Sequence, residues 1–414
     1  MNHTPLEDQV HDALARRAKP LQHPPLALGD VRRRARRIQV RRRVAAGVAV
    51  AAALAVAVPV GLALDGPARR TEQPPVDRTP GVVGTVRVDP RSASVGSGPG
   101  APLVDVAAQT VTLGDEVVEL PKAYELATPF GDGWFAALRQ DDGAWTVNWL
   151  TPDLEVEDFT DGTSEPVLAP DGSRYAVASF DRVGTWAVMS YDTARQEPER
   201  PWASVEQASP GSTVGIVGFV SEDQVLGYQL DAQTGTSSYF VAEGEEVTPY
   251  DGIEEAASAS PATGMVAGRT TLADGRSCAA TFDGASRSAE PLWTDCDREL
   301  SQFSPDGSLV AAFGAGDPNA AGDESGVSLL DATTGRSLVD FEVTPVRNRV
   351  VGIADQVVWE DDEHLLATYT DGDQQFVVRL GVDGSVERVA GPVTVELGTV
   401  GLRLTPGRLS PGRS

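Results

Sequence analysis

The sequence of 414 residues is poor in the side chains that commonly act as nucleophiles, proton carriers or metal ligands. It holds two cysteines and four histidines, and His364 is the only histidine beyond residue 23. A zinc site built from His and Cys and a Ser-His-Asp triad are therefore both disfavoured. No G-x-S-x-G turn, Walker A loop, S-x-x-K motif or Rossmann glycine pattern after a strand is present. The sequence predicts no catalytic, cofactor-binding or metal-binding residue, and hence a protein that is not an enzyme.

Positive charge is concentrated in a short part of the chain. Residues 1–43 hold 11 of the 34 lysines and arginines together with only four acidic residues, and residues 44–64 hold no charge at all. The rest of the chain has 23 basic and 56 acidic residues. Such an asymmetry indicates that the two charged parts of the chain have different surroundings.

Residues 44–64 form a long, uncharged apolar run. As a helix these 21 residues would measure about 31 Å, which matches the hydrocarbon core of a bilayer. Arg41, Arg42 and Arg43 directly precede the run, and the positive-inside rule then places residues 1–43 in the cytoplasm. We expect a single-pass membrane protein whose residues from 65 onward lie outside the cell. A cleaved signal peptide, which could be a twin-arginine signal, and a buried core helix are the alternatives.

The basic tail, residues 1–43, predicts two kinds of contact. A short helix is expected near its start, and the narrow apolar stripe of this helix is a candidate for docking a cytosolic partner: Leu6, Val10 and Leu14. The arginines beside the apolar run would contact anionic lipid, at about 1 kcal/mol per charge. Nucleic-acid binding is disfavoured because no aromatic residue interleaves these arginines.

Beyond the apolar run, a linker leads into a repeated pattern. Residues 65–103 are rich in Pro, Gly and Ser and predict an extended, mostly disordered linker. Residues 104–404 then repeat a unit in which turn residues precede a short apolar strand, followed by an alternating hairpin such as the one that turns at Asp283 and Gly284. The first apolar residues of these strands lie 40 to 56 residues apart: Trp134, Tyr175, Val225, Met265, Leu309 and Leu365. Four strands in every ~45 residues are typical of a β-propeller.

The two ends of the repeated region complement each other. Residues 104–120 predict a hairpin that lacks its two inner strands, and residues 393–404 predict strands that lack a hairpin. If both belong to one blade, the ring closes and no sheet edge is left open between its ends. We therefore expect an all-β fold, a β-propeller of about seven four-stranded blades, followed by a disordered C-terminus at 405–414. Six blades with an additional hairpin are the alternative.

Two of the turns resemble a known family. Residues 170–173 (Pro-Asp-Gly-Ser) and 304–308 (Ser-Pro-Asp-Gly-Ser) are similar to the WD40-like repeats of TolB-type propellers, with weaker matches in four other repeats. The resemblance covers roughly residues 104–404 and implies a propeller that serves as a binding platform. It implies no catalytic residue, because the motif positions are turn-formers. The tail and the apolar run also resemble those of uncharacterised actinobacterial membrane proteins.

The two cysteines, Cys278 and Cys296, are 18 residues apart in the chain. Outside the cell an even number of cysteines predicts a disulfide, which would contribute about 3 kcal/mol by closing such a loop. Two unpaired thiols in the core are the alternative.

Acidic clusters and tryptophans are the remaining candidates for binding. The acidic clusters are Asp317, Asn319 and Asp323; Glu360 to Glu363; and Asp371 and Asp373. Oxygen ligands at such short spacing could hold Ca²⁺, but Ala321 interrupts an EF-hand-like order. Solvated surface acids are the favoured explanation. Paired carboxylates for glycoside hydrolysis can be recognised only from their separation in space. Most tryptophans fall at strand positions and predict inter-blade core, whereas Trp202 and Trp293 lie near turns and are better candidates for a binding face.

These features together favour a membrane-anchored extracytoplasmic propeller that binds a protein, a peptide or an envelope glycan. Two alternatives remain open. One is an anti-sigma-like transmembrane regulator whose tail holds a cytosolic partner, although the His and Cys zinc motif of many anti-sigma domains is absent. The other is a glycan-acting enzyme on the propeller fold.

Overall fold

The computed structural model describes residues 82–141, 143–169, 174–180, 185–192, 203–284, 290–314, 326–344, 351–395 and 401–405. These residues belong to one compact unit, Thr79–Ser414. They form strands and turns without any helix, so the predicted all-β class is confirmed. No helix that could cross a membrane occurs among them, and the predicted tail and membrane segment, residues 1–64, lie outside the described residues.

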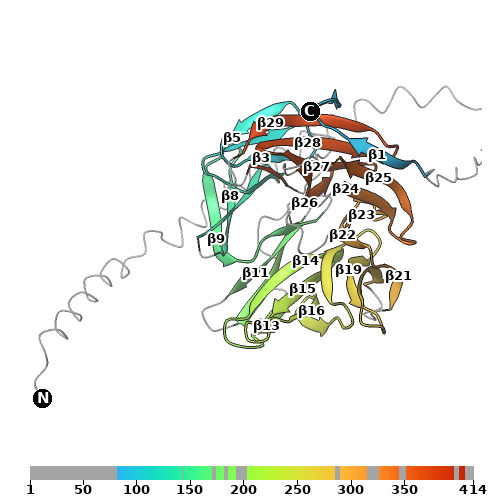
Figure 1. The fold of residues 1–414 in the computed structure, drawn as a ribbon. Helices are drawn as coiled ribbons and strands as arrows, with labels where there is room; N and C mark the ends of the chain where they lie inside the picture. The colour runs from blue at the N-terminus through green and yellow to red at the C-terminus, as the bar shows by residue number, and fades with distance from the viewer. Residues whose placement is uncertain are drawn as a thin grey trace, which may run out of the picture. The chain divides into compact units, whose positions relative to one another are not determined.

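The strands form six hydrogen-bonded sheets arranged around a common centre (Figure 1). Three of them are four-stranded: β3 (Leu103–Asp105), β4 (Thr110–Leu113) and β5 (Glu116–Glu119) with β30 (Leu402–Leu404); β14 (Thr213–Ser221), β15 (Gln224–Leu230), β16 (Ser237–Glu243) and β17 (Glu246–Pro249); β18 (Glu255–Ala259), β19 (Met265–Thr271), β20 (Ser277–Asp283) and β21 (Pro291–Asp295).

Two sheets are five-stranded because each gains a strand from the N-terminal part of the unit. The first consists of β22 (Arg298–Phe303), β23 (Leu309–Gly314), β24 (Gly326–Asp331) and β25 (Ser337–Val343) with β1 (Gly84–Val88). The second consists of β26 (Val351–Trp359), β27 (His364–Asp371), β28 (Gln374–Gly381) and β29 (Val386–Thr394) with β2 (Ser94–Val95). The eight-stranded sheet holds β6 (Leu126–Phe130), β7 (Gly133–Arg139), β8 (Trp145–Leu150), β9 (Val156–Thr163), β10 (Val167–Leu168), β11 (Arg174–Phe180), β12 (Thr185–Asp192) and β13 (Ala203–Glu206).

The arrangement is that of a propeller, but the number of blades differs from the expected seven. Five sheets are separate blades of four or five strands, and the sixth contains eight strands. The two halves of this larger sheet are joined by one residue pair, Thr163 of β9 with Ser179 of β11. Strands from two predicted repeats therefore share one sheet, which sequence periodicity cannot reveal because it does not specify pairing between repeats.

The expected pairing of the chain ends is confirmed in part. Strand β30 pairs antiparallel with β3, with Leu404 opposite Leu103, and completes the sheet that β3, β4 and β5 begin. Strand β29 does not take part, because it pairs with β28 in the preceding sheet. Thr405, which was expected in a disordered C-terminus, is fully buried and donates its backbone N–H to the carbonyl of Pro102 at 2.9 Å.

The hydrophobic core lies between neighbouring sheets, and three indole groups join one sheet to the next. The indole Nε1–H of Trp186 donates to the carbonyl of Ser212, that of Trp293 to Ala332, and that of Trp359 to Gln302, at 2.8 to 3.1 Å. The ring of Trp293 also packs on Gly335 of the adjacent sheet, and its expected place on a binding face stays a prediction. Trp202 lies outside the described residues.

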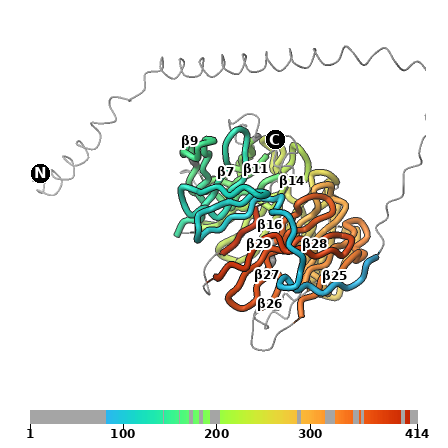
Figure 2. The backbone as a smooth tube through the Cα atoms, turned by 90° about the horizontal axis from the view of Figure 1, so that it is seen from above, coloured from blue at the N-terminus to red at the C-terminus, as the bar shows by residue number. Residues whose placement is uncertain are grey.

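The predicted linker 65–103 is not disordered in its second half. Residues 82–100, which we call the strap, run along the outer edges of two blades, as the blue segment in Figure 2 shows. Within the strap, β1 pairs in parallel with β25, and β2 pairs in parallel with β29. The glycines and prolines that suggested flexibility serve close packing instead.

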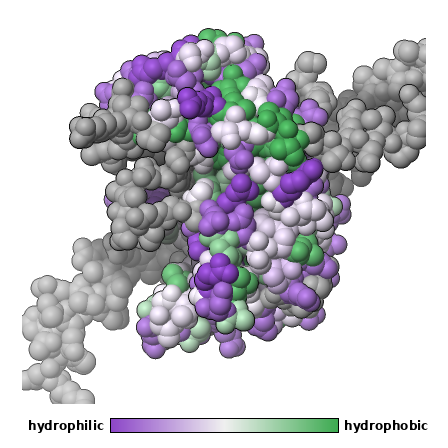
Figure 3. Space-filling model, turned by 45° about the vertical axis from the view of Figure 1, so that its right-hand side comes forward, coloured by the Kyte–Doolittle hydropathy of each residue, from purple (hydrophilic) through white to green (hydrophobic). Residues whose placement is uncertain are grey.

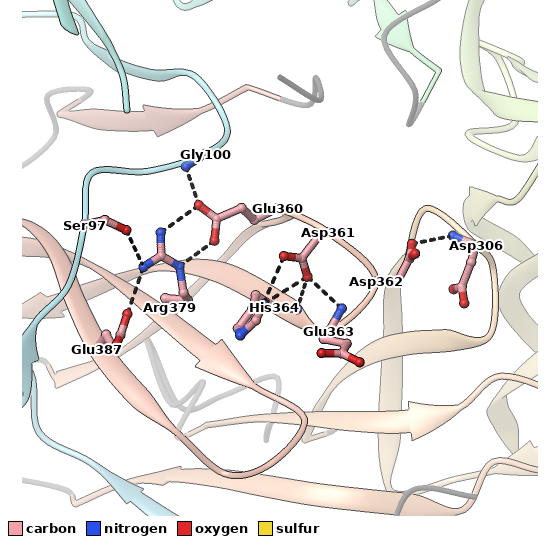
Figure 4. A network of polar contacts seen from close by, with 10 residues as sticks. All are labelled: Ser97, Gly100, Asp306, Glu360, Asp361, Asp362, Glu363, His364, Arg379 and Glu387. Carbon is pink, nitrogen blue, oxygen red and sulfur yellow. Dashed lines mark hydrogen bonds and ion pairs between the residues drawn. The ribbon is translucent and has the colours of Figure 1, made fainter. Parts of the chain in front are cut away.

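A buried ion pair holds the end of the strap (Figure 4). The guanidinium of Arg379 donates to both carboxylate oxygens of Glu360, and the two side chains are only 11% and 10% exposed. The same guanidinium donates to Glu387 at 2.8 Å and to the carbonyl of Gly98 at 3.1 Å, and Glu360 also accepts the backbone N–H of Gly100. A buried pair of this kind needs all its partners, because removing one leaves an uncompensated charge.

The strap needs glycine where it approaches other backbone. A Cβ at Gly98 would collide with the backbone carbonyl of Gly114, and a Cβ at Gly100 would lie 2.6 Å from the carboxylate of Glu360. Backbone atoms cannot rotate away as a flexible side chain can. Position 98 therefore excludes every residue except glycine.

The predicted disulfide between Cys278 and Cys296 is present. Cys278 belongs to β20 and is fully buried, and Cys296 directly follows β21, the neighbouring outer strand of the same sheet. The bond closes a loop with a sequence separation of 18. It contributes about 3 kcal/mol by the chain-entropy argument and holds the strand that carries Trp293.

We expect Gly98→Ala to destabilise the protein, because the added methyl group forces the strap away from Gly114. The loss should be about 1–3 kcal/mol in the free energy of unfolding, measured by urea denaturation. Gly314→Ala is the matched control, since a Cβ there would meet nothing within 4 Å. Equal stability of the two variants would contradict the docked strap.

Candidate functional site

The sequence-predicted acidic cluster after β26 is used within the protein (Figure 4). Asp361 accepts the backbone N–H groups of Glu363 and His364, each at 2.8 Å, and its carboxylate lies 3.0 Å from the imidazole Nδ1 of His364. Asp362 accepts the backbone N–H of Asp306, at 3.1 Å, from the neighbouring sheet. These carboxylates therefore order a turn and join two blades.

No Ca²⁺ site is formed by these predicted clusters in the described part of the chain. No group of three or more His, Cys, Asp or Glu among the described residues could hold a metal ion. Asp371 accepts the Nε–H of the strap residue Arg91 at 2.8 Å. Other candidate residues lie outside the described ranges: Leu6, Val10, Leu14, Arg41, Arg42, Arg43, Asp317, Asn319 and Asp323.

A central cavity of about 810 Å³ could hold a ligand. Residues of β7, β15, β27 and β28 contribute to its lining, together with seven strands that are each the innermost strand of their repeat: β6, β10, β14, β18, β22, β26 and β30. Each of these innermost strands has one edge that pairs with its own sheet, so its other edge faces the centre. The cavity is thus a product of ring closure.

One side of the cavity carries four charged side chains. Arg403 of β30 forms an ion pair with Glu125, which precedes β6, and these side chains are 25% and 16% exposed. Arg403 faces Glu125 because β30 alternates, with Leu402 and Leu404 buried on its opposite face. Glu165 and Arg139 line the same side. Neither of them has an ion-pair partner among the residues that the structure describes.

The carboxyl group of Glu165 has an unusual environment for a side chain that solvent can reach. It lies inside the cavity, where surrounding protein atoms replace part of its hydration, and this desolvation raises its pKa. The guanidinium groups of Arg403 and Arg139 lower the pKa, and the carboxylate of Glu125 raises it. Desolvation is the largest of these effects, so the pKa of Glu165 remains above its ordinary value.

Tyr228 extends the charged side of the cavity. Its ring packs directly on Gly215 of the paired strand β14, where any side chain would collide with the ring. Burial raises the pKa of the Tyr228 hydroxyl, and the nearby carboxylate of Glu165 adds to this effect. Gly215 therefore gives Tyr228 its position beside Glu165.

Neutral amides also line the cavity. Gln375 of β28 accepts the backbone N–H of Leu402, the neighbour of Arg403, at 2.8 Å, and its amide oxygen lies where a Cβ at Gly401 would approach to 2.5 Å. Gln302 of β22 is a second amide in the lining. As with Tyr228, a glycine provides the space for the polar side chain of Gln375.

The remaining surface offers no comparable apolar site among the described residues. Val82 and Val83 precede β1, and the other exposed large hydrophobic side chains belong to six different strands: Val95, Val117, Val156, Phe180, Leu230 and Leu292. On the face shown in Figure 3, hydrophobic atoms form separate patches among hydrophilic ones. Isolated apolar side chains of this kind are normal on a protein surface.

Sequence reasoning did not identify the cavity residues. Glu125 and Arg403 are 278 positions apart, and no local motif marks either of them. Among the described residues, the cavity lining holds two carboxylates and two guanidinium groups, and the other lining residues there are uncharged. His364 is not among the lining residues, so the one histidine of the described part provides no base there. The arrangement is suited to binding a ligand through hydrogen bonds.

We expect Glu165→Gln to stabilise the protein at neutral pH. A carboxyl whose pKa is raised on folding makes the native state bind more protons than the unfolded state, so stability falls as pH rises from the ordinary value of 4.5 through the raised pKa. The amide cannot ionise, and its advantage should disappear below about pH 4.

The measurement is the melting temperature of both proteins between pH 3 and pH 8, with Glu116→Gln on the outer strand β5 as the control. A lower melting temperature of Glu165→Gln at pH 7 than that of the unmodified protein would contradict the assigned environment.

Comparisons with known proteins concern the fold. No family model and no curated protein matches the chain. It is similar in structure to oligopeptidase B from Leishmania major (11% identity, TM-score 0.47), TolB from Acinetobacter baumannii (15%, 0.39) and an oligogalacturonate lyase in complex with manganese (14%, 0.40). The match to oligopeptidase B covers 74% of this chain and 50% of that chain. The match to TolB covers 71% of this chain and 79% of that chain, and the match to the lyase covers 72% and 83%. The chain thus spans half the length of oligopeptidase B and has TolB-like propellers among its structural neighbours.

Proposed function

We propose that this protein is a membrane-anchored binding module whose propeller lies outside the cytoplasm and holds a protein, peptide or glycan ligand in the central cavity. The observation that carries this proposal is the cavity of about 810 Å³ with its convergent polar side chains. Concave sites of this volume with a few well-placed polar groups are the usual form of ligand sites.

The location outside the cytoplasm rests on sequence and on the disulfide. The arginines before residues 44–64 favour a cytoplasmic N-terminus. The bond between Cys278 and Cys296 supports an oxidising compartment for the propeller. The excess of acidic over basic residues after position 64 is also compatible with a soluble domain held at a distance from anionic lipid.

A glycan-acting enzyme is a second candidate, favoured by one observation. Glu125 and Glu165 line the same cavity in different environments: Glu125 is paired with Arg403, whereas the pKa of Glu165 is raised by desolvation. Two carboxyl groups held in different environments are the arrangement from which an acid and its partner are drawn in glycoside hydrolysis.

A transmembrane regulator is the third candidate, and the strap favours it. Because residues 82–100 pair with two blades, the described part of the chain that lies nearest in sequence to the proposed anchor is attached to the propeller itself. A change in these blades could therefore reach the tail, whose apolar stripe would bind a cytosolic partner.

We expect a photo-crosslinking amino acid at position 228 to capture a ligand in cells that produce the full chain. Tyr228 lines the cavity, so an occupant lies within reach of the probe. The control places the same probe at Val117, which is 62% exposed on the outer strand β5. Adducts that are absent at 228, or equal at both positions, would show that the cavity does not bind the ligand.

Topology can be tested separately. We expect protease added to intact cells to remove the propeller while residues 1–43 stay protected by the membrane. An N-terminal and a C-terminal epitope followed by immunoblot distinguish the two parts. Protection of both epitopes in intact cells, with cleavage only after lysis, would refute an extracytoplasmic propeller.

A further inference from the structure

The polar side chains of the cavity share one property, which restricts the ligand. Six of them end in a planar group with two hydrogen-bonding atoms: Glu125, Glu165, Arg139, Arg403, Gln302 and Gln375. A planar group with two such atoms can bind two adjacent hydroxyl groups of a sugar at once, as the fork of arginine binds both oxygens of a carboxylate. Six such groups around one cavity could contact several hydroxyl groups of one ligand.

The charges of the cavity indicate that the ligand is neutral. The two carboxylates and two guanidinium groups among its described lining residues balance, although the chain after position 64 has 56 acidic and 23 basic residues. An anionic ligand would meet the acidic field of the propeller without any net positive charge from these lining residues. A cationic ligand would likewise find no net negative charge among them. A neutral ligand needs no net charge of either sign.

Glu165 and Arg139 together require a ligand that both donates and accepts hydrogen bonds. Arg403 and Glu125 already bind each other, whereas Glu165 and Arg139 have no ion-pair partner within the described ranges. Glu165 can only accept when ionised, and Arg139 can only donate. A hydroxyl group does both, so neighbouring hydroxyls could contact Glu165 and Arg139 in turn.

The walls of the cavity favour a flat, polar ligand over a peptide. The large apolar side chains of the inner strands are buried between the sheets: Phe219 is 2% exposed, Leu402 5% and Trp359 6%. The cavity therefore presents few apolar pockets of the kind that peptide side chains fill. Its wall instead offers small residues such as Ala256 and Ala257 and the ring of Tyr228, a surface on which the apolar face of a sugar can pack.

We propose that the central cavity binds a neutral oligosaccharide, with Glu165 accepting from sugar hydroxyls, Arg139 donating to them, and Tyr228 packing on a sugar ring. This proposal rests on the proposed binding function and names the ligand class of the same site. The ligand also contacts the amides of Gln302 and Gln375.

The test uses the full chain in a detergent without a sugar headgroup, because a maltoside would compete for the site. An array of oligosaccharides that includes neutral N-acetylglucosamine and glucose oligomers and acidic uronate oligomers gives the first readout. We expect binding of neutral oligomers only, followed by calorimetry with the best neutral trimer. Binding restricted to acidic oligomers, or binding to none, overturns the proposal.

Variants then place the ligand in the cavity. Glu165→Gln should weaken binding of the trimer about 10-fold, as expected when one hydrogen bond to a charged group is lost. Glu116→Gln on β5 should leave the affinity unchanged, and Tyr228→Ala provides a second variant that does not alter charge. Equal affinities of all three variants and the unmodified protein would place the sugar elsewhere and overturn the proposal.

The ligand class and the binding function of the cavity can be refuted separately. If the array shows no neutral sugar but the probe at position 228 captures a polypeptide, the ligand class is wrong and the cavity is still a binding site. If both the array and the probe are negative, the proposed function fails as well. Release of shortened sugars during the assay, lost in Glu165→Gln, would support sugar binding at this site and favour the enzyme over the binding module.

Discussion

The pairing of the last described strand with the first strand of the ring is the constraint on which the rest of the structure depends. Strand β30 completes the sheet of β3, β4 and β5, so the two ends of the repeated region are held in one blade. This pairing brings Arg403 to Glu125, and with them it forms the charged side of the cavity. An open ring would leave a sheet edge unpaired at each end and would leave the cavity without one wall.

The strap adds a second closure on the outside of the ring. Its strands extend the outer edges of two blades, and its last residues lie over the buried pair of Arg379 and Glu360 before the chain enters β3. The N-terminal segment therefore contacts three consecutive sheets. The glycines at 98 and 100 permit this close approach. A stretch whose composition is typical of a flexible linker therefore packs firmly against the blades.

The cavity follows from the same geometry. Inner strands must approach one another at the centre, where small residues and exposed strand edges are required, and their apolar side chains turn into the spaces between sheets. Two of the polar side chains at the centre occupy space that a glycine leaves open, Tyr228 beside Gly215 and Gln375 beside Gly401. A balanced set of charges in this partly desolvated space costs less than an excess of one sign.

The sequence by itself determined the all-β class, the repeat, the closure of the ends and the disulfide of Cys278 and Cys296, because strand periodicity, turn residues and cysteine spacing are local or need only one pairing rule. The tertiary structure alone decided the merging of two repeats at Thr163 and Ser179, the docking of the strap, and the meeting of Glu125, Glu165, Arg139 and Arg403. These depend on hydrogen bonds and charges between residues far apart in the chain. Such contacts leave no local pattern, since each partner alone is an ordinary surface residue.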